Sequence, residues 1–167
     1  MHDELTRVDI EKMQEELDYR RFTLRPKLIE DVQTARAFGD LSENFEYKAA
    51  KQEKNRNDSR IRYLENMIKT AVVIEGGSKA DEVGLFDKVE VWLEDEEEAE
   101  TFQIVTTLRQ NALEGLLSKE SPVGKALLGH KVGDRVEVKV SADYSYFAVI
   151  RSIEKGEDPE DVPIGLY

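Results

Sequence analysis

The chain has 167 residues, contains no cysteine and carries a formal net charge of −12. This composition excludes a disulfide framework and a thiolate metal site, and the lack of a long apolar run argues against a signal peptide and a membrane span. We therefore expect a soluble cytoplasmic protein, built as one ordinary domain or as a small domain with an elongated element.

The negative charge is concentrated in the second half of the chain. Residues 1–75 contain 14 Lys and Arg against 16 Asp and Glu, a net −2, whereas residues 76–167 contain 10 against 20, a net −10. Nucleic acid would repel the second half, so we expect neither nonspecific duplex binding nor sequence-specific DNA binding. Residues 47–62 are locally basic, with six Lys and Arg against two acids, a net +4. That run is either a solvated helix face or a surface that contacts phosphate groups.

A first long helix is predicted from Thr6, which has the spacing of an amino-terminal cap with Asp9, to about Phe38. Its apolar residues recur at intervals of three and four: Ile10, Met13, Leu17, Leu24, Leu28 and Ala35. Pro26 removes a backbone hydrogen bond within this helix, so we expect a bend there and not a domain boundary.

A second helix of the same type is predicted from about Ser42 to Thr70. Its apolar positions have the same spacing: Ala50, Ile61, Leu64, Ile68 and Ala71. If the chain folds back so that the two apolar sets face each other, the turn between the helices is centred between Ser42 and Glu43. Lys54 and Asn57 interrupt the second set, and polar groups in a seam fix its register at a cost in stability. The two helices predict an antiparallel coiled-coil hairpin with arms of about 40 Å.

The second half predicts a small α+β domain. Short β-type runs are expected at 71–74, 88–93, 101–106, 135–140 and 146–153, with the acidic run 94–100 as a hairpin loop. The run 121–129 predicts a short helix with a serine cap, a proline in its first turn and a glycine stop. Strands with one short helix indicate a curved antiparallel sheet.

The predicted organisation is therefore two-domain. Residues 1–75 form the helical hairpin, with an acidic tip at 39–47. Residues 76–153 form the α+β domain. Residues 154–167, which are acidic and contain two prolines, are expected to be a flexible tail, with docking of its last residues left open.

The acidic tip allows two interpretations of Asp40 and Glu43. The spacing Asp-x-x-Glu is that of a capping box, in which the aspartate accepts a backbone N–H and the glutamate reaches back. A cap does not require a long stalk, however, and two carboxylates three residues apart can also converge on one side of a tip. Magnesium takes six oxygen ligands and retains water, so two carboxylates complete a magnesium site only together with a substrate phosphate or another protein.

Two segments resemble the signatures of a known family. The run GDLSENFEYKAA at 39–50 is similar to the tip signature of the bacterial Gre transcript-cleavage factors, of the GreA type. The run SPVGKALLG at 121–129, followed by VGD at 132–134, resembles the carboxy-terminal signature of the same family. The two motifs occur in the family's order and at its separation, and the resemblance extends from about Leu5 to Ile153.

The resemblance implies a coiled coil that enters the secondary channel of RNA polymerase and an FKBP-like domain that holds the channel rim. It also implies that Asp40 and Glu43 are the family's catalytic acidic pair, which helps to hold a magnesium ion jointly with the polymerase and orients the attacking water. The polymerase then cuts the backtracked RNA, and elongation restarts from the new 3′ end. The chain would thus be a non-enzymatic factor that binds no magnesium tightly alone.

Six residues around the tip are candidates for contact with the RNA 3′ end or the polymerase: Arg36, Ser42, Asn44, Tyr47, Lys48 and Lys51. Each has a structural alternative. Ser42 and Asn44 are suited to capping the second helix, which is the role that the sequence favours. Phe45 and Tyr47 are expected to pack under the bend, with stacking of Tyr47 on an RNA base as the alternative. The three cations contact phosphate or form a solvated face.

Two rival functions are consistent with parts of the chain. A non-cleaving regulator would occupy the channel and block substrate entry. The acidic pair argues against it, whereas departures from the family pattern in the second half favour it: the segment 106–110, where an acidic run is expected, and a longer tail after Ile153. A prolyl isomerase is the second rival, disfavoured because the second half has few aromatic residues to line an apolar pocket.

Overall fold

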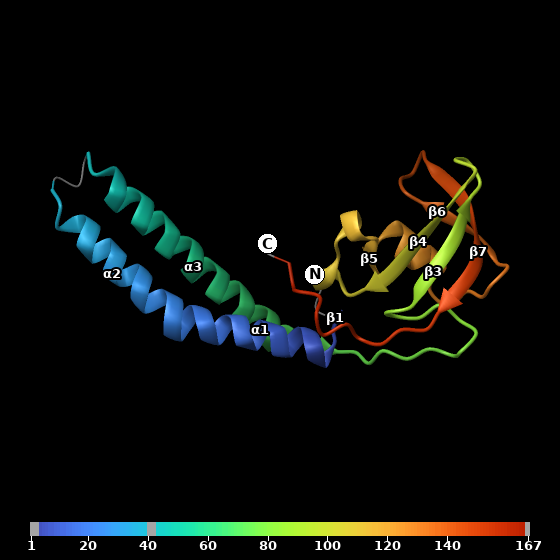
Figure 1. Cartoon of the computed structure of the whole chain (residues 1–167), viewed down its shortest axis with the longest axis horizontal. Coiled ribbons are helices and arrows are strands. Elements are labelled where there is room, and N and C mark those ends of the chain that lie inside the picture. Colours follow the sequence, from blue (N-terminus) through green and yellow to red (C-terminus); the bar gives the residue numbers. More distant parts are fainter. Residues whose placement is uncertain (1–3, 40–42, 166–167) are drawn as a thin grey trace. The chain divides into compact units, whose positions relative to one another are not determined.

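The computed structural model describes residues 4–39 and 43–165 and consists of two compact units (Figure 1). One unit is Ile10–Val72, and the other combines Met1–Asp9 with Val73–Tyr167. This division differs from the predicted domains at the amino terminus, because Leu5 is buried and its carbonyl accepts a hydrogen bond of 2.9 Å from the Ile74 N–H. The residues before the hairpin therefore belong to the carboxy-terminal unit.

The Ile10–Val72 unit is the predicted antiparallel pair of helical arms. The first arm runs through α1 (Arg7–Tyr19), a π-helical turn η1 (Arg20–Leu24) and α2 (Arg25–Arg36), and the second arm is α3 (Phe45–Thr70). The 26 residues of α3 extend over about 39 Å at the helical rise. Because the arms stop at Arg36 and Phe45, the connection is longer than the sequence predicts. In the part of the chain that the structure describes, no helix is both long and apolar enough to span a membrane.

Pro26 explains the π-helical turn. Proline has no N–H to donate, and its ring collides with the carbonyl four residues earlier, here that of Phe22. In η1 the Arg25 N–H donates to the Arg20 carbonyl, five residues back, which widens the helix immediately before the proline. The ribbon changes direction between α1 and α2 (Figure 1), so the predicted bend is present and the helix continues through it.

The seam between the arms combines apolar and polar side chains. The buried apolar residues come from both arms: Met13, Leu17, Leu28, Ala35, Ile61, Leu64 and Met67. Asn57, a predicted polar seam position, is buried and accepts a hydrogen bond of 2.9 Å from the Arg20 side chain. Buried Arg60 donates to both oxygens of Glu16, at 2.6 and 3.1 Å. This network favours one register, because sliding either arm would leave buried polar groups unpaired.

The carboxy-terminal unit is built on a curved five-stranded sheet in the order β5-β4-β3-β7-β6 (Figure 1). Its strands are β3 (Lys88–Leu93), β4 (Glu98–Val105), β5 (Leu116–Ser118), β6 (Arg135–Lys139) and β7 (Ser145–Glu154). Neighbours are antiparallel except β4 and β5, which are parallel. The shorter elements are β1 (Glu4–Leu5), β2 (Val72–Val73) and the 3-10 turns η2 (Thr107–Arg109) and η3 (Ala112–Glu114). The predicted α+β architecture is confirmed.

The core of this unit lies between the sheet and α4 (Pro122–Leu127). Its buried residues include Val83, Val89, Val91, Ile104, Leu127, Val136 and Ile150. The predicted helix ends are confirmed, since Ser121 Oγ accepts the Gly124 N–H at 3.0 Å and Gly129 has a φ of +82°. A Cβ on Gly124 would lie 2.2 Å from the Ser118 carbonyl oxygen, so glycine is needed where α4 approaches β5.

The segment after β7 docks on the carboxy-terminal unit, which corrects the prediction of a flexible tail. The Gly156 N–H donates to Asp87 at 3.0 Å, and the Gly165 N–H donates to the Leu108 carbonyl at 2.6 Å. Val162 packs against a buried apolar cluster. Composition gives no signal for this docking, because the contacts are made by backbone groups and isolated side chains and not by an apolar run.

Arg109 in η2 is the main anchor of the tail. Its side chain is fully buried, with Nε 2.8 Å from the Asp9 carboxylate, Nη1 donating to the Pro159 carbonyl at 2.7 Å and Nη2 paired with Asp158. The Thr6 hydroxyl also donates to Asp158, at 2.6 Å. Thr6 and Asp9 form the predicted reciprocal cap at the start of α1, with bonds of 3.1 and 3.3 Å. This network joins the amino-terminal segment, η2 and the tail.

Candidate functional site

The tip of the hairpin carries the predicted acidic pair, of which the structure describes one residue. Glu43 lies two positions before α3, and its side chain is exposed. Asp40 and Ser42 lie outside the described residues. Gly39 has a φ of +148°, a conformation that residues with a side chain rarely adopt, so glycine is favoured where the chain leaves the first arm.

Asn44 is the cap of α3 and also ties the two arms together. Its Oδ1 accepts a hydrogen bond of 2.9 Å from the Tyr47 N–H, inside the first turn. Its Nδ2 donates to the Ala35 carbonyl, near the end of α2, at 2.7 Å. Capping, the role that the sequence favours for Asn44, is confirmed. The bond to Ala35 is a further role that sequence spacing does not predict.

Because Asn44 caps α3, a capping box does not describe the start of this helix. A capping box places its glutamate three residues after the cap, whereas Glu43 precedes the cap. The Glu43 carboxylate therefore lies outside the first turn of α3 and faces the surroundings of the tip. An exposed carboxylate in this position holds a hard cation only when a partner supplies most of the ligands.

Cations and aromatic rings alternate around the tip. The Arg36 guanidinium and the Lys51 ammonium lie 5.8 and 5.9 Å from the centre of the Tyr47 ring. The Lys48 ammonium lies 5.6 Å from the centre of the Phe45 ring. These distances are in the range of cation–π contacts. Together with Asn44, which binds the Tyr47 N–H, five of the six predicted contact residues thus lie at one end of the hairpin.

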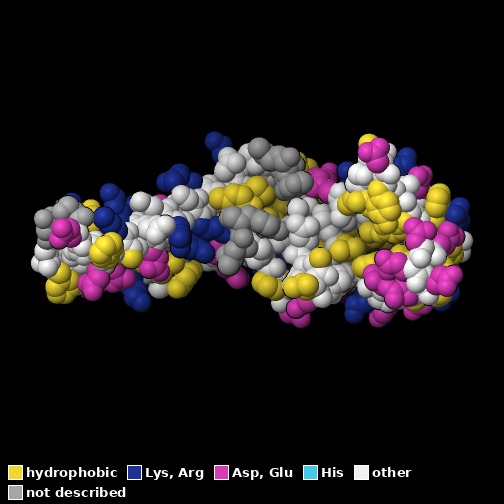
Figure 2. Space-filling view, turned by 90° about the horizontal axis from the view of Figure 1, so that it is seen from above, with side chains coloured by type: hydrophobic (Ala, Val, Ile, Leu, Met, Phe, Trp, Pro, Cys, Tyr) yellow, Lys and Arg dark blue, Asp and Glu magenta, His cyan; other side chains and the backbone are white. Residues whose placement is uncertain are grey.

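Three cations of the basic run 47–62, Lys48, Lys51 and Arg56, lie on one face of α3. An open hollow of about 390 Å³ on this face is lined by Lys48, Lys51, Gln52, Asn55, Arg56 and Ser59. These residues recur every three or four positions, as residues on one helix face do. Lys and Arg side chains recur along the hairpin in Figure 2. Two other cations of the run serve the fold, since Arg60 binds Glu16 and Lys54 binds Asp58 at 2.9 Å.

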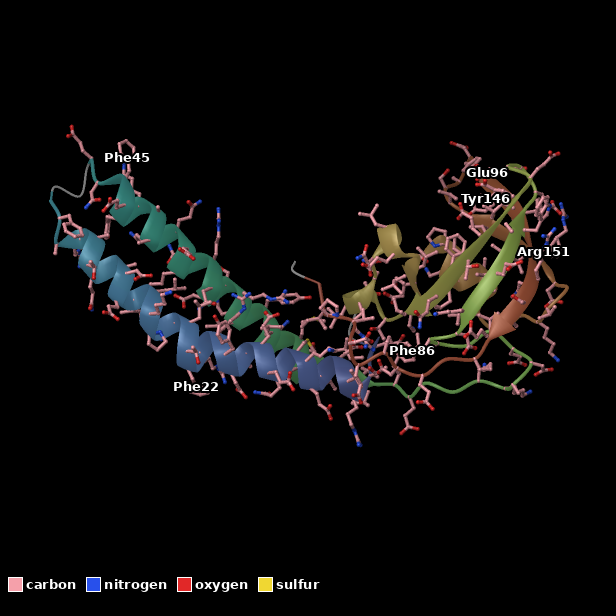
Figure 3. All side chains as sticks on the ribbon, in the orientation of Figure 1. Phe22, Phe45, Phe86, Glu96, Tyr146 and Arg151 are labelled. Carbon is pink, nitrogen blue, oxygen red and sulfur yellow. The ribbon has the colours of Figure 1, made fainter. Side chains whose placement is uncertain are left out.

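Phe45 is 80% exposed, so the prediction that it packs under the bend is wrong. Figure 3 shows Phe45 at the first turn of α3, pointing away from α2. Phe38 is 72% exposed, and the sequence gives no signal for it. Both rings line a hollow of about 710 Å³, together with Gly39, Glu43, Asn44 and Glu46. The apolar periodicity could not identify these rings as exposed. Both lie at the ends of the seam, where the exposure of a side chain depends on the residue at which each helix ends.

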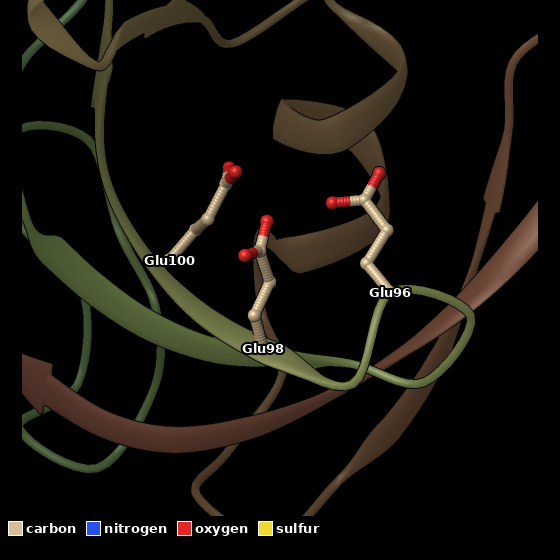
Figure 4. A group of neighbouring side chains, drawn as sticks. All are labelled: Glu96, Glu98 and Glu100. Atoms are coloured by element: carbon tan, nitrogen blue, oxygen red, sulfur yellow. The ribbon is translucent and has the colours of Figure 1, made fainter.

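A second group of carboxylates lies on the β3–β4 hairpin of the carboxy-terminal unit. One oxygen from each of Glu96, Glu98 and Glu100 falls within 4.8 Å of the others (Figure 4). A hydrogen bond shared with Glu98, burial and the surrounding negative charges raise the pKa of Glu96. Exposed like charges of this kind are common without an ion, so we assign the group no metal.

Two family models cover most of the chain. Residues 4–73 match "Transcription elongation factor, N-terminal", and residues 78–155 match "Transcription elongation factor, GreA/GreB, C-term". The transcription elongation factor GreA of Geobacillus kaustophilus is 42% identical over 136 residues, which cover 81% of this chain and 86% of the relative. That of Thermoanaerobacter pseudethanolicus is 44% identical over 139 residues, covering 83% and 88%. A crystal structure of GreA factor homolog 1 from Thermus thermophilus is 29% identical, covers 93% of this chain and 100% of that chain, and has a TM-score of 0.42.

Proposed function

The chain belongs to the GreA/GreB family of transcription elongation factors, and on this premise we propose that it stimulates the cleavage of backtracked RNA by RNA polymerase. The hairpin enters the secondary channel of the polymerase, and the carboxy-terminal unit holds the channel rim. The reaction belongs to the polymerase, so the factor is not itself an enzyme and supplies carboxylates in trans. Cleavage leaves a new RNA 3′ end, from which an arrested complex resumes elongation.

The observation that carries this proposal is the exposed Glu43 carboxylate at the end of a helical hairpin. Glu43 is not needed to cap α3, because Asn44 is the cap. The second arm has 26 residues and a length of about 39 Å. A carboxylate at the end of so long and narrow a projection is suited to a site inside another protein.

Asp40 and Glu43 are the residues that would hold magnesium. Carboxylate oxygens are the ligands that magnesium prefers, but the ion takes six oxygens and keeps several waters. Two carboxylates therefore hold it only jointly with the polymerase and the RNA phosphates. When bound, the ion stabilises the charge on the attacking and leaving oxygens of a phosphodiester hydrolysis. The carboxylates of this chain complete the ligand set and accept a hydrogen bond from the attacking water.

Arg36, Lys48 and Lys51 are proposed to contact the RNA backbone. The contacts of Arg36 and Lys51 with the Tyr47 ring hold these cations near the start of α3. Positive side chains beside the acidic residues offset the repulsion between the acids and RNA phosphates. Such contacts release counterions, so the cations are expected to make binding weaker as salt rises.

The proposal is tested with a stalled, backtracked transcription complex. The unaltered protein is expected to shorten the RNA from its 3′ end. Asp40→Asn and Glu43→Gln each remove one charge without changing size, and each is expected to lower the cleavage rate by about 100-fold or more, the lower range for a positioned acid or base. Glu53→Gln is the matched control, because Glu53 is an exposed acid on α3 away from the tip.

The same experiment distinguishes the proposed cleavage factor from the non-cleaving regulator. Inhibition of RNA synthesis that persists unchanged in Asp40→Asn and Glu43→Gln, without RNA shortening by the unaltered protein, contradicts the proposal. RNA shortening that disappears in both variants, with binding to the polymerase retained, supports it. Binding is measured separately, by displacement of a labelled copy of the unaltered protein.

A further inference from the structure

Two phenylalanine rings at the hairpin tip have no role in the packing of the arms. Phe38 is 72% exposed and Phe45 is 80% exposed. Phe38 follows the end of α2, and Phe45 is the first residue of α3, so both lie beyond the buried seam. Burying a phenylalanine side chain stabilises a fold, and the hairpin forgoes this gain at both positions. The rings are therefore accessible to a partner.

The two rings share a hollow with an acid of the proposed site. Phe38, Glu43 and Phe45 line the same open space of about 710 Å³. A planar group that enters this space and contacts a ring is held close to the Glu43 carboxylate.

The surroundings of the rings favour a nucleic acid over an apolar protein surface. Lys48 lies 5.6 Å from the centre of the Phe45 ring, and Arg36 and Lys51 flank the neighbouring Tyr47 ring. Aromatic rings interleaved with cations are typical of proteins that bind single-stranded nucleic acid, where the bases stack on the rings and the cations follow the backbone. An apolar protein surface packed here would instead remove water from these cations without offering them a partner, which costs free energy.

We propose that Phe45, with Phe38 beside it, is a stacking platform for an unpaired base of the backtracked RNA. The inference rests on the proposed function, which brings the RNA 3′ end to the tip. The ring holds the nucleotide so that its phosphodiester lies next to Glu43. Phe45 is thus a positioning residue and takes no part in proton transfer or metal binding.

The test combines Phe45→Ala with RNA that lacks one base. Backtracked complexes are prepared with natural RNA and with transcripts that carry an abasic ribose at single positions near the 3′ end. On natural RNA, with limiting factor, Phe45→Ala is expected to lower cleavage efficiency by about 5- to 150-fold, the range implied by stacking of one base on one ring. On the transcript that lacks the stacked base, unaltered protein and Phe45→Ala are expected to cleave equally.

Rescue and control variants separate stacking from a structural effect. Phe45→Trp keeps an aromatic face and is expected to restore cleavage to within a few fold. Phe22→Ala is the matched control, because Phe22 is 73% exposed in η1, away from the tip (Figure 3), and its removal is expected to change nothing.

Three outcomes would overturn the inference. If Phe45→Ala lowered cleavage efficiency by the same factor on every abasic transcript, the ring would be assigned to a contact with the polymerase. Full activity of Phe45→Ala on natural RNA would remove the platform while leaving the proposed cleavage function intact. Absence of cleavage with the unaltered protein would overturn both proposals, and so identifies a failure of the proposed function.

Discussion

Asn44 connects the geometry of the tip to the stability of the hairpin. One side-chain amide caps α3 through the Tyr47 N–H and also donates to the Ala35 carbonyl of the other arm. The cap satisfies a backbone donor that the helix itself cannot satisfy, and the second bond holds the two arms together beside Glu43. The position of Glu43, the residue before Asn44, therefore depends on this amide.

Asn44→Ala is expected to destabilise the tip by about 1–2 kcal/mol, since it removes the cap and the bond to Ala35. Asn44→Asp keeps the hydrogen-bond acceptor and places a negative charge at a helix amino terminus. It is therefore expected to destabilise the tip less than Asn44→Ala does. Amide hydrogen exchange of Tyr47 and Lys48 measures the effect locally. Equal protection in Asn44→Ala and the unaltered protein would contradict the cap's contribution.

Single residues at the tip were predictable in part. The sequence favoured Asn44 as a cap because capping chemistry is local, and it selected Tyr47, Lys48 and Lys51 as candidate contact residues because they lie close to the tip in the sequence. The prediction that Phe45 packs under the bend is wrong, because the exposure of that ring depends on the residue at which α3 begins. The prediction for Asp40 and Ser42 lies outside the described residues and stays a prediction.

The seam of the hairpin is held by a charged network as well as by apolar contacts. Glu16 accepts hydrogen bonds from Arg60 and from Arg20 at 2.9 Å, and Arg20 also binds Asn57. Burial acts to raise the pKa of the Glu16 carboxyl, but the hydrogen bonds and charges of Arg60 and Arg20 outweigh burial and lower it. A lowered pKa in the folded state means that ionised Glu16 stabilises the fold.

The stability of the hairpin is therefore expected to fall in acid. The contribution of Glu16 is fully present above its ordinary pKa of 4.5 and is lost as the pH falls through the lowered value. Glu16→Gln is expected to reduce the midpoint of thermal unfolding at pH 7, and to show a weaker dependence on pH below about 4.5. Far-UV circular dichroism follows the helical signal. The control is Glu15→Gln, an exposed neighbour, and an identical pH dependence in both variants would contradict the assignment.

Most elements were predictable, and the missed ones have identifiable causes. The bounds of β3 agree with the prediction because both faces of that strand have a clear pattern. Strand β5 has three residues, too few for alternation to be recognised, and pairs in parallel with β4. The bend at Pro26 was predictable, but its π-helical form was not, because several local adjustments relieve the same missing hydrogen bond.

The two segments interpreted from the sequence as departures from the family pattern are connected within the carboxy-terminal unit. The segment 106–110 contains Arg109, and the longer tail contains its partners Asp158 and Pro159. The buried arginine of this segment is thus paired with an acid in the tail. Sequence patterns could not reveal this pairing, since the partners are 49 and 50 positions away.

Asp158→Ala is expected to destabilise the carboxy-terminal unit by about 3 kcal/mol, because it leaves the buried Arg109 with one carboxylate partner. The change corresponds to a fall of more than about 10 °C in the unfolding midpoint of a unit of this size. Differential scanning calorimetry measures it. Glu157→Ala removes the same charge from an exposed position, so equal midpoints for the two variants would show that the buried pair contributes nothing.

The network around Arg109 has a consequence for synthesis on the ribosome. Thr6 is translated 152 positions before its partner Asp158. At about 5–20 residues per second, the nascent amino terminus waits roughly 8–30 s before that partner exists. The hairpin arms can pair during this interval, whereas the tail docks on the second unit only once Asp158 has been synthesised. A product terminated before Asp158 would therefore lack this contact.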